Sequence, residues 1–245
     1  MRRPRPATPH KIILPLAAAL LTHGGAAAGP NAASAPATRS QPVPAARQAR
    51  PEVVAIKAAR ALPAGSVVTV EGVVTTPPGA FRSSTEDEGF AVEDASGAGV
   101  YVRTNVRTSF GVGRLVRVTG RLDDSNGKAV LVPADARGIE RRRLVADAPR
   151  PRQVSTREVG EGTEGRLVSV AGVISKPVQN DAPYGFRFFV DDGTGEVQIF
   201  VSASTKIPRA GLRPGRRVRV TGFSGQYKEH YEVEPRFASD IRPGR

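Results

Sequence analysis

Hydrophobic and polar residues alternate along several short stretches of the chain, and this alternation predicts β-strands. Val68 and Val70 alternate with polar neighbours, and Val116 and Val118 do the same. A period of two with one polar face is typical of a half-buried antiparallel strand. Clusters of Gly, Asp, Ser and Asn separate the stretches, and only residues 52–62 suggest a turn or two of helix. The pattern therefore predicts an all-β chain.

These stretches occur twice in the same order, which indicates an internal repeat. The pentapeptide VRVTG stands at residues 116–120 and again at 218–222, each time just after a Gly-Arg pair. Further matching segments are 67–77 with 167–177, 90–97 with 188–195, and 100–102 with 199–201. Such self-similarity indicates two copies of one module of roughly 90 residues. We expect the valines of VRVTG to fill the core and Gly120 and Gly222 to permit a sharp bend or bulge.

The segment before the first copy has a different character. Four cations precede an apolar run at residues 12–21, and Ala26 to Ala28 follow it. This order is typical of a secretory signal peptide; a membrane anchor is the alternative, but the run is short and contains Pro15. We predict an exported protein, periplasmic or extracellular. The predicted segments are a signal peptide at 1–28, a disordered Ala/Pro-rich linker at 29–50, the first module at 51–143, a basic linker at 144–152 and the second module at 153–245.

The composition argues against common kinds of catalytic site. The chain has no cysteine, and His230 is the only histidine outside residues 1–28. Thiol nucleophiles, disulfides and Cys-based zinc sites are therefore excluded, and a His cluster cannot form within one chain. The pairs Glu93–Asp94 and Asp191–Asp192 occupy the same turn in both copies, which favours turn formation over acid–base chemistry. We predict no enzymatic activity, cofactor or metal, although an Asp-based divalent site stays open.

The chain is strongly basic, with a formal net charge of +13. Loss of residues 1–28, which hold four cations and no acid, would leave about +9. Such a charge favours polyanionic partners. The alternative explanation of the charge is a general preference for arginine in the composition, without a polyanionic partner. Cations are concentrated in the second module and at the junction between modules, whereas residues 86–88 of the first module are acidic. A polyanion should therefore prefer the second module and the junction between the modules.

The repeated motifs resemble a known fold family. A strand of the form VxVxGVV, a strand ending in V(E/D)DxxG, the strand VYV or IFV, and then GxxVRVTG are similar to the OB-fold, in the form found as tandem modules of bacterial secreted proteins. The resemblance covers residues 58–140 and 154–242. It implies two five-stranded barrels, with ligands bound along the outer face of strands two and three. The helix usual between strands three and four is hard to find here.

The outward positions of the second copy supply the candidate binding site. If Phe188 and Val190 point inward, then Arg187 and Phe189 point outward, and so does Phe200 on the next strand. Rings of this kind can stack on nucleobases. The predicted nucleic-acid-binding set is Lys176, Tyr184, Phe186, Arg187, Phe189, Phe200, Arg217, Arg219, Tyr227 and Lys228, with Tyr101 and Arg103 from the poorer face of the first copy.

Two interpretations remain open at this point. In the first, an exported, non-enzymatic OB-fold protein binds single-stranded nucleic acid or a similar polyanion through its second module, with a secreted nuclease or an envelope protein as a further candidate partner and no membrane span in the mature chain. In the second, a periplasmic or envelope interaction module binds a protein or an anionic glycan. This second interpretation holds even if the outward aromatic rings are covered by the neighbouring module, by the segment between strands three and four or by the C-terminal tail, with Phe223 and Phe237 as candidate partners.

Overall fold

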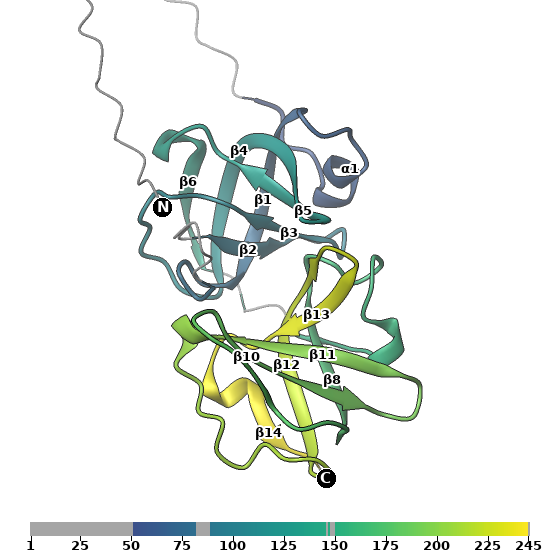
Figure 1. Cartoon of the computed structure of the whole chain (residues 1–245). Coiled ribbons are helices and arrows are strands. Elements are labelled where there is room, and N and C mark those ends of the chain that lie inside the picture. The colour runs from purple at the N-terminus through teal and green to yellow at the C-terminus, as the bar shows by residue number, and fades with distance from the viewer. Residues whose placement is uncertain (1–50, 82–88, 146, 148–149, 245) are drawn as a thin grey trace, which may run out of the picture. The chain divides into compact units, whose positions relative to one another are not determined.

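The computed structural model describes residues 51–81, 89–145, 147 and 150–244. The signal peptide and linker predicted for residues 1–28 and 29–50, and the acidic run at 86–88, lie outside the described residues. The described residues belong to one compact unit that contains both copies of the repeat (Figure 1).

The first copy forms a closed five-stranded barrel. Its strands are ordered β1-β2-β3-β5-β4, and antiparallel pairing between β1 and β4 closes the sheet. Strands β3 and β5 pair in parallel, and β6 extends the sheet along β4. The elements are α1 (Ile56–Arg60), β1 (Val67–Thr76), β2 (Phe90–Glu93), β3 (Gly99–Val102), β4 (Arg114–Ser125), β5 (Lys128–Val132), η1 (Ala136–Gly138) and β6 (Ile139–Val145).

The second copy repeats this topology. Its barrel has the order β8-β10-β11-β13-β12, closed by pairing of β12 with β8, and β11 and β13 again pair in parallel. Short strands β7, β9 and β14 pair with β8, β10 and β12. The elements are β7 (Arg152–Gln153), η2 (Thr156–Glu158), β8 (Leu167–Ile174), β9 (Gln179–Asp181), β10 (Gly185–Asp191), β11 (Glu196–Ser202), η3 (Ala203–Thr205), β12 (Arg217–Tyr227), β13 (His230–Glu234), η4 (Ala238–Asp240) and β14 (Ile241–Pro243).

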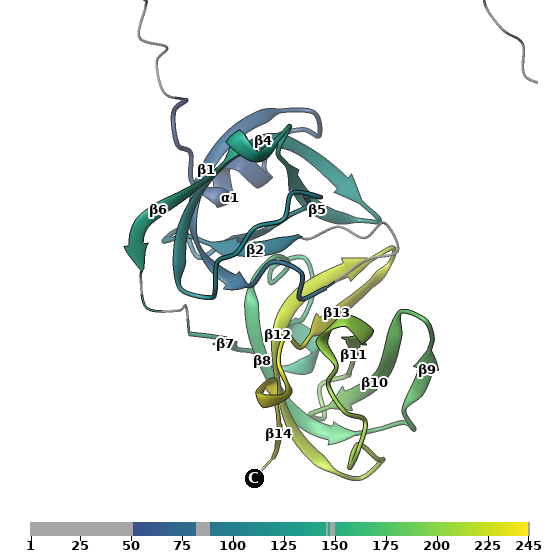
Figure 2. The same ribbon diagram turned by 90° about the vertical axis from the view of Figure 1, so that its left-hand side faces the viewer.

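The prediction of an all-β chain with two tandem five-stranded OB-fold barrels is confirmed by this topology (Figures 1 and 2). The short helix predicted within residues 52–62 is α1. Strands β6, β7, β9 and β14 were not predicted; they are additions that pair with the barrel strands β4, β8, β10 and β12. Arg141 and Arg142, two of the cations near the junction between the modules, lie within β6.

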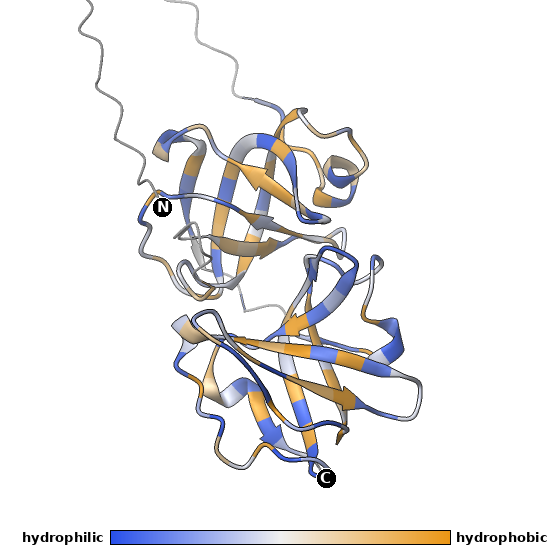
Figure 3. Ribbon diagram, in the orientation of Figure 1, coloured by the Kyte–Doolittle hydropathy of each residue, from blue (hydrophilic) through white to orange (hydrophobic). Residues whose placement is uncertain are grey.

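Alternation along the strands builds one core in each barrel, visible as banding of hydrophilic and hydrophobic positions in Figure 3. Val116 and Val118 belong to the first core, and Val218 and Val220 belong to the second. All four side chains are buried, as the VRVTG repeat predicts.

The glycine that ends each VRVTG segment lies against the backbone of a neighbouring strand. A Cβ atom at Gly120 would lie 2.8 Å from the carbonyl carbon and oxygen of Val132, and one at Gly222 would lie 2.5 Å from the carbonyl oxygen of Glu234. Such distances leave no room for a side chain. Glycine is therefore required by the close approach of β4 to β5 in one barrel and of β12 to β13 in the other.

Asp94 and Asp192 form the predicted turns after the second strand of each barrel, whereas Glu93 is buried at the end of β2 and accepts a hydrogen bond from the backbone nitrogen of Leu167 in the second module. In the first barrel Asp94 accepts hydrogen bonds from the backbone nitrogens of Ser96 (3.0 Å) and Ile56 (2.7 Å). In the second, Asp192 accepts them from the nitrogens of Thr194 and Thr156, both at 3.0 Å. Burial opposes ionisation of Asp192, but these bonds and those from the two threonine hydroxyls outweigh it and lower its pKa. Each aspartate thus ties the segment that precedes its barrel to a turn.

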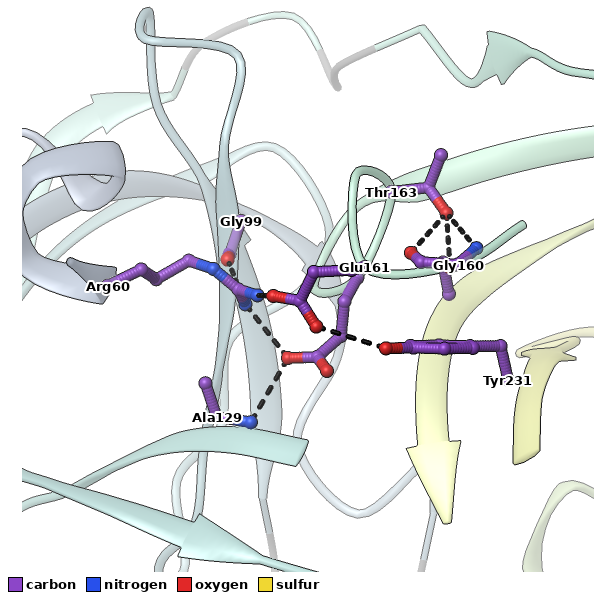
Figure 4. Close-up of polar contacts among 9 residues, drawn as sticks. Arg60, Gly99, Ala129, Gly160, Glu161, Thr163 and Tyr231 are labelled. Atoms are coloured by element: carbon purple, nitrogen blue, oxygen red, sulfur yellow. Dashed lines mark hydrogen bonds and ion pairs between the residues drawn. The ribbon is translucent and has the colours of Figure 1, made fainter. Parts of the chain in front are cut away.

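A polar cluster joins the two modules (Figure 4). Arg60, next to the first barrel, lies 3.0 Å from a carboxylate oxygen of Glu164 and 3.4 Å from one of Glu161. Glu164 also accepts a hydrogen bond from the backbone nitrogen of Ala129 (3.0 Å), and the Tyr231 hydroxyl lies 3.0 Å from Glu161. Burial raises the pKa of Glu164, while the Arg60 charge opposes the rise. Glu164 of the second module thus contacts both Arg60 and Ala129 of the first module, and these contacts hold the modules together.

Candidate nucleic-acid interface

Two aromatic rings lie on the outer face of adjacent strands in the second barrel. In β10 the core takes Phe188 and Val190, which leaves Phe189 partly exposed on the outer face. In β11 Phe200 is likewise outward and partly exposed. The predicted orientation of both rings is confirmed. The register pairs Phe189 with Gln198 and Phe200 with Arg187, so the two rings are diagonal neighbours, a spacing of about 7–8 Å between backbones.

Cationic side chains border these rings, and each has an acidic partner. The ammonium group of Lys176 lies 4.6 Å from the centre of the Phe189 ring and forms an ion pair with Glu196. The hydrogen bond from Lys176, with a second from Ser175, lowers the pKa of Glu196. Arg187 donates a hydrogen bond to the side-chain oxygen of Gln179 (2.9 Å) and lies 3.8 Å from Asp181. The face is therefore amphipathic, and its local charge is more balanced than the sequence suggests.

A buried glutamate adjoins the aromatic pair on the neighbouring strand. Glu232 on β13 is opposite Gln198 on β11 and accepts a hydrogen bond from its amide nitrogen (2.6 Å). Burial, and after it the neighbouring Glu234 carboxylate, raise the pKa of Glu232 to about 8. The side chain therefore retains its proton at pH values where an ordinary glutamate is ionised, so it adds little negative charge beside the aromatic pair.

Two exposed tyrosines stand on the turns that border the barrel, where the sequence places them. Tyr184 lies between β9 and β10 and Tyr227 at the end of β12, and each is 52% exposed. Lys228 follows in the β12–β13 turn with its ammonium group 5.4 Å from the centre of the Tyr227 ring. Its backbone nitrogen donates a hydrogen bond to the carbonyl of Asn126 in the first module (2.6 Å), so the turn is held at one end.

Phe186, a residue of the predicted binding set, does not lie on the outer face of the barrel. Phe186 lies within β10, is 6% exposed and belongs to the core of the second barrel. The strand begins earlier than the repeat suggests because β9 pairs with its first residues. Inward alternation therefore continues from Val190 through Phe188 to Phe186, and this pattern is readable from the sequence.

Arg217 and Arg219 point outward but are not on the strands that carry the aromatic pair. Both lie on β12 and pair with residues of β8, and Arg219 also pairs with Arg242 of β14; neither pairs with β10 or β11. The structure therefore divides the predicted set into an aromatic face on β9 to β11, defined by Gln179, Arg187, Phe189, Gln198 and Phe200, and a basic strip on β12.

The predicted ligand contact at Tyr101 is wrong, because the second module covers this side chain. Tyr101 is only 4% exposed and packs in a cluster with Ala91 and with Phe223 of β12. The Phe223 ring centre lies 5.7 Å from that of Tyr101, and the Lys128 ammonium group lies 4.6 Å from the Tyr101 ring centre. The covered state considered for outward aromatic rings thus holds in the first barrel and not in the second.

Arg103, the other predicted residue of the first module, forms an ion pair with Asp123 at 2.6 Å. Its side chain is about one-third exposed, at 33%. Arg103 follows β3 and Asp123 lies in β4, so the pair links strand ends within one barrel. It lies apart from the aromatic face, which belongs to the second module.

Within the part of the chain that the structure describes, no group of three or more His, Asp or Glu side chains is arranged to hold a metal ion. No helix among these residues is long and apolar enough to span a membrane.

No protein-family model matches the chain, and no curated protein matches its sequence. Similar solved structures include an OBody bound to hen egg-white lysozyme, with 21% identity, a TM-score of 0.32, and coverage of 41% of this chain and 99% of that one. The hypothetical protein ygiW from E. coli has 14% identity, a TM-score of 0.30, and coverage of 39% and 94%. A murine DNA-binding protein bound to double-stranded DNA has 11% identity, a TM-score of 0.41, and coverage of 72% and 96%.

Proposed function

We propose that the aromatic face of the second module binds single-stranded nucleic acid or a similar polyanion with low sequence specificity. The observation that carries the proposal is the pair of outward, partly exposed rings, Phe189 and Phe200, at diagonal positions on β10 and β11. Stacking on such rings contributes about 1–3 kcal/mol per base and tolerates any base. The equivalent face of the first module is covered, so one barrel carries the ligand and the other supports it.

The polar groups beside the rings suit a nucleic-acid strand. Arg187 lies beside Phe200 and offers a guanidinium group to phosphate, while Gln179 and Gln198 offer amides to base edges. Binding would weaken with salt, since each phosphate neutralised releases counterions and contributes about −0.7 to the slope of log K against log salt for a single strand. With Lys176 and Arg187 already paired with carboxylates, we expect a shallow slope of about −1 to −3, from only a few phosphates.

The experiment is fluorescence anisotropy of labelled oligo-dT, duplex DNA and an anionic polysaccharide, each titrated with the full chain across a salt series. Phe189→Ala and Phe200→Ala should each weaken oligo-dT binding about tenfold, because one lost stacking contact costs about 1–3 kcal/mol. Leu62→Ala is the matched control, since Leu62 is an exposed hydrophobic residue (46%) of the first module. Near-ultraviolet and far-ultraviolet circular dichroism would verify that each variant is folded.

Equal binding to all three probes, lost with salt and unaffected by either ring, would contradict the proposal and leave an unspecific basic surface. The second candidate function is an interaction module for a protein or an anionic glycan. The ion pairs Lys176–Glu196 and Arg187–Asp181 favour the protein partner within this candidate, since they reduce the charge available to any polyanion. Binding of the polysaccharide, but not of oligo-dT, through Phe189 and Phe200 would support this candidate.

A further inference from the structure

A groove opens on a part of the second module away from the aromatic face. It is formed by β7, β8, β12 and the segment around η4, with Pro77 and Val112 of the first module at its edge. Its volume is about 590 Å³, within the range of small-molecule sites. The aromatic face lies on β9 to β11 and shares none of the residues that line this groove.

A buried hydroxyl group without a partner lines the groove. Ser169 points outward from β8, between the inward Val168 and Val170, and is 1% exposed. Its Oγ has no hydrogen-bond partner among the described residues. A buried hydroxyl left unbonded is costly, so its retention in this position favours a ligand atom as its partner.

The matching position in the first module shows what the second one lacks. There, Thr69 on β1 and Thr119 on β4 are opposite each other and their hydroxyls are hydrogen-bonded at 2.8 Å. In the second module Ser169 is opposite Thr221 in the same register, and the bond is absent. Both Ser169 and Thr221 line the groove. The Ser169 hydroxyl therefore has no hydrogen bond at the position where the first module has the Thr69–Thr119 hydrogen bond.

The charges in the groove favour an anion. Arg219 bonds to the side-chain oxygen of Gln153 and Arg242 to the carbonyl oxygen of Ser239, and neither has a carboxylate partner among the described residues. Asp240, the carboxylate in the groove, is already occupied by Arg236, whose Nε and Nη2 donate to it at 2.9 and 3.0 Å. Two arginines without acidic partners therefore face the groove.

The groove also contains an accessible aromatic ring. Phe237 precedes η4 and is 39% exposed, with the Arg236 guanidinium group 5.2 Å from the ring centre. An exposed ring beside unpaired arginines can stack on a flat heterocycle while the arginines hold an attached anion. A hydroxyl such as that of Ser169 can bond to the sugar that links them.

We propose that this groove binds a phosphorylated nucleoside, with the phosphate held by Arg219 and Arg242, the base against Phe237 and a polar atom of the ligand on Ser169. The ligand is either a free nucleoside monophosphate or the 5′-phosphorylated end of a strand, which share this chemistry. The site does not depend on the aromatic face, since Phe189 and Phe200 are on other strands.

Isothermal titration calorimetry of the full chain with nucleoside monophosphate, nucleoside, ribose 5-phosphate and inorganic phosphate tests the site. The monophosphate should bind at least tenfold tighter than either ribose 5-phosphate or the nucleoside. Arg219→Gln and Phe237→Ala should each raise its Kd at least tenfold. Arg217→Gln is the matched control: it removes an outward arginine of the same strand that does not line the groove.

Ser169→Ala should affect ligand binding and protein stability differently. It should weaken nucleotide binding but leave the melting temperature of the ligand-free protein unchanged or higher, because the lost hydroxyl has no bond there.

A competition experiment distinguishes the two sources of the ligand. A 5′-phosphorylated oligo-dT that competes with the monophosphate, when the unphosphorylated strand does not, would identify the strand end as the ligand. No competition would identify the free nucleotide.

Several results would overturn the inference: no heat with any nucleotide, equal Kd values for the monophosphate and inorganic phosphate, or a Kd unchanged in Arg219→Gln. The double variant Phe189→Ala/Phe200→Ala should leave monophosphate binding intact. The experiments can therefore reject the nucleotide site in the groove without rejecting strand binding by the aromatic face, and the reverse.

Discussion

Each VRVTG segment needs glycine at its last position because a side chain there would collide with the neighbouring strand, and not because of an unusual backbone conformation. At Gly222 a Cβ atom would also lie 2.8 Å from Cγ1 of Val233, in addition to the Glu234 carbonyl. Neither atom can move without displacing β13, which carries Val233 in the core and Glu232 beside the aromatic face. A single missing methyl group therefore determines how closely β12 approaches β13.

We expect Gly222→Ala to reduce the free energy of unfolding by about 1–3 kcal/mol, as overpacking of a tight contact does. Gly162→Ala is the control, because no atom lies within 4 Å of its Cβ position. That variant should stay within about 0.5 kcal/mol of the parent. Urea unfolding measures both, and equal stabilities for the two variants would contradict the contact argument.

The strands that form the candidate site were predictable where side chains alternate. Phe188 and Val190 inside, with Phe189 and Phe200 outside, follow from period two and from alignment of the two copies. The same rule, extended to the start of β10, places Phe186 inside, where the structure has it, and only the pairing of these residues with β9 is not evident locally. Alternation fixes which side of a strand a residue takes, but it does not say what lies against that side.

Burial is the main reason why the pKa of Glu232 is raised. This side chain is buried on β13, bonded to Gln198 and close to Glu234, a set of contacts that no sequence pattern reveals. Its pKa is about 8 in the folded protein and near 4.3 in an unfolded chain. Between these values the folded state retains a proton that the unfolded chain has lost, so stability from this group is present at low pH and falls as pH rises toward 8.

We predict that Glu232→Gln removes this part of the pH dependence. Glutamine keeps an oxygen for the Gln198 amide and cannot ionise, so the variant should gain stability relative to the parent from pH 6 to pH 8. The difference changes by at most about 1.4 kcal/mol per pH unit, the value for one proton. Urea unfolding from pH 5.5 to 8.5 measures it, and parallel curves for the two proteins would show that Glu232 is ionised throughout.

The contact between the modules explains why two similar barrels present different surfaces. Phe223 follows directly after the VTG of the second copy, and its fully buried ring lies against Phe81 and Tyr101 of the first module. The β12–β13 hairpin lies beside the first barrel in both views (Figures 1 and 2). The repeat shows that the two faces are homologous, but contacts between residues more than 100 positions apart decide which one is open.

This contact makes the folding of the two modules interdependent. Phe223→Ala should reduce the free energy of unfolding by about 3–5 kcal/mol, the usual cost of truncating a buried phenylalanine. Because its ring fills a cluster shared by both modules, the single calorimetric transition expected for the parent should separate into two. Phe237→Ala, which removes a ring that is 39% exposed, should retain one transition and cost less than about 1 kcal/mol. Two transitions in the parent, or equal losses in the two variants, would mean that the barrels fold independently and that the cover over Tyr101 is readily displaced.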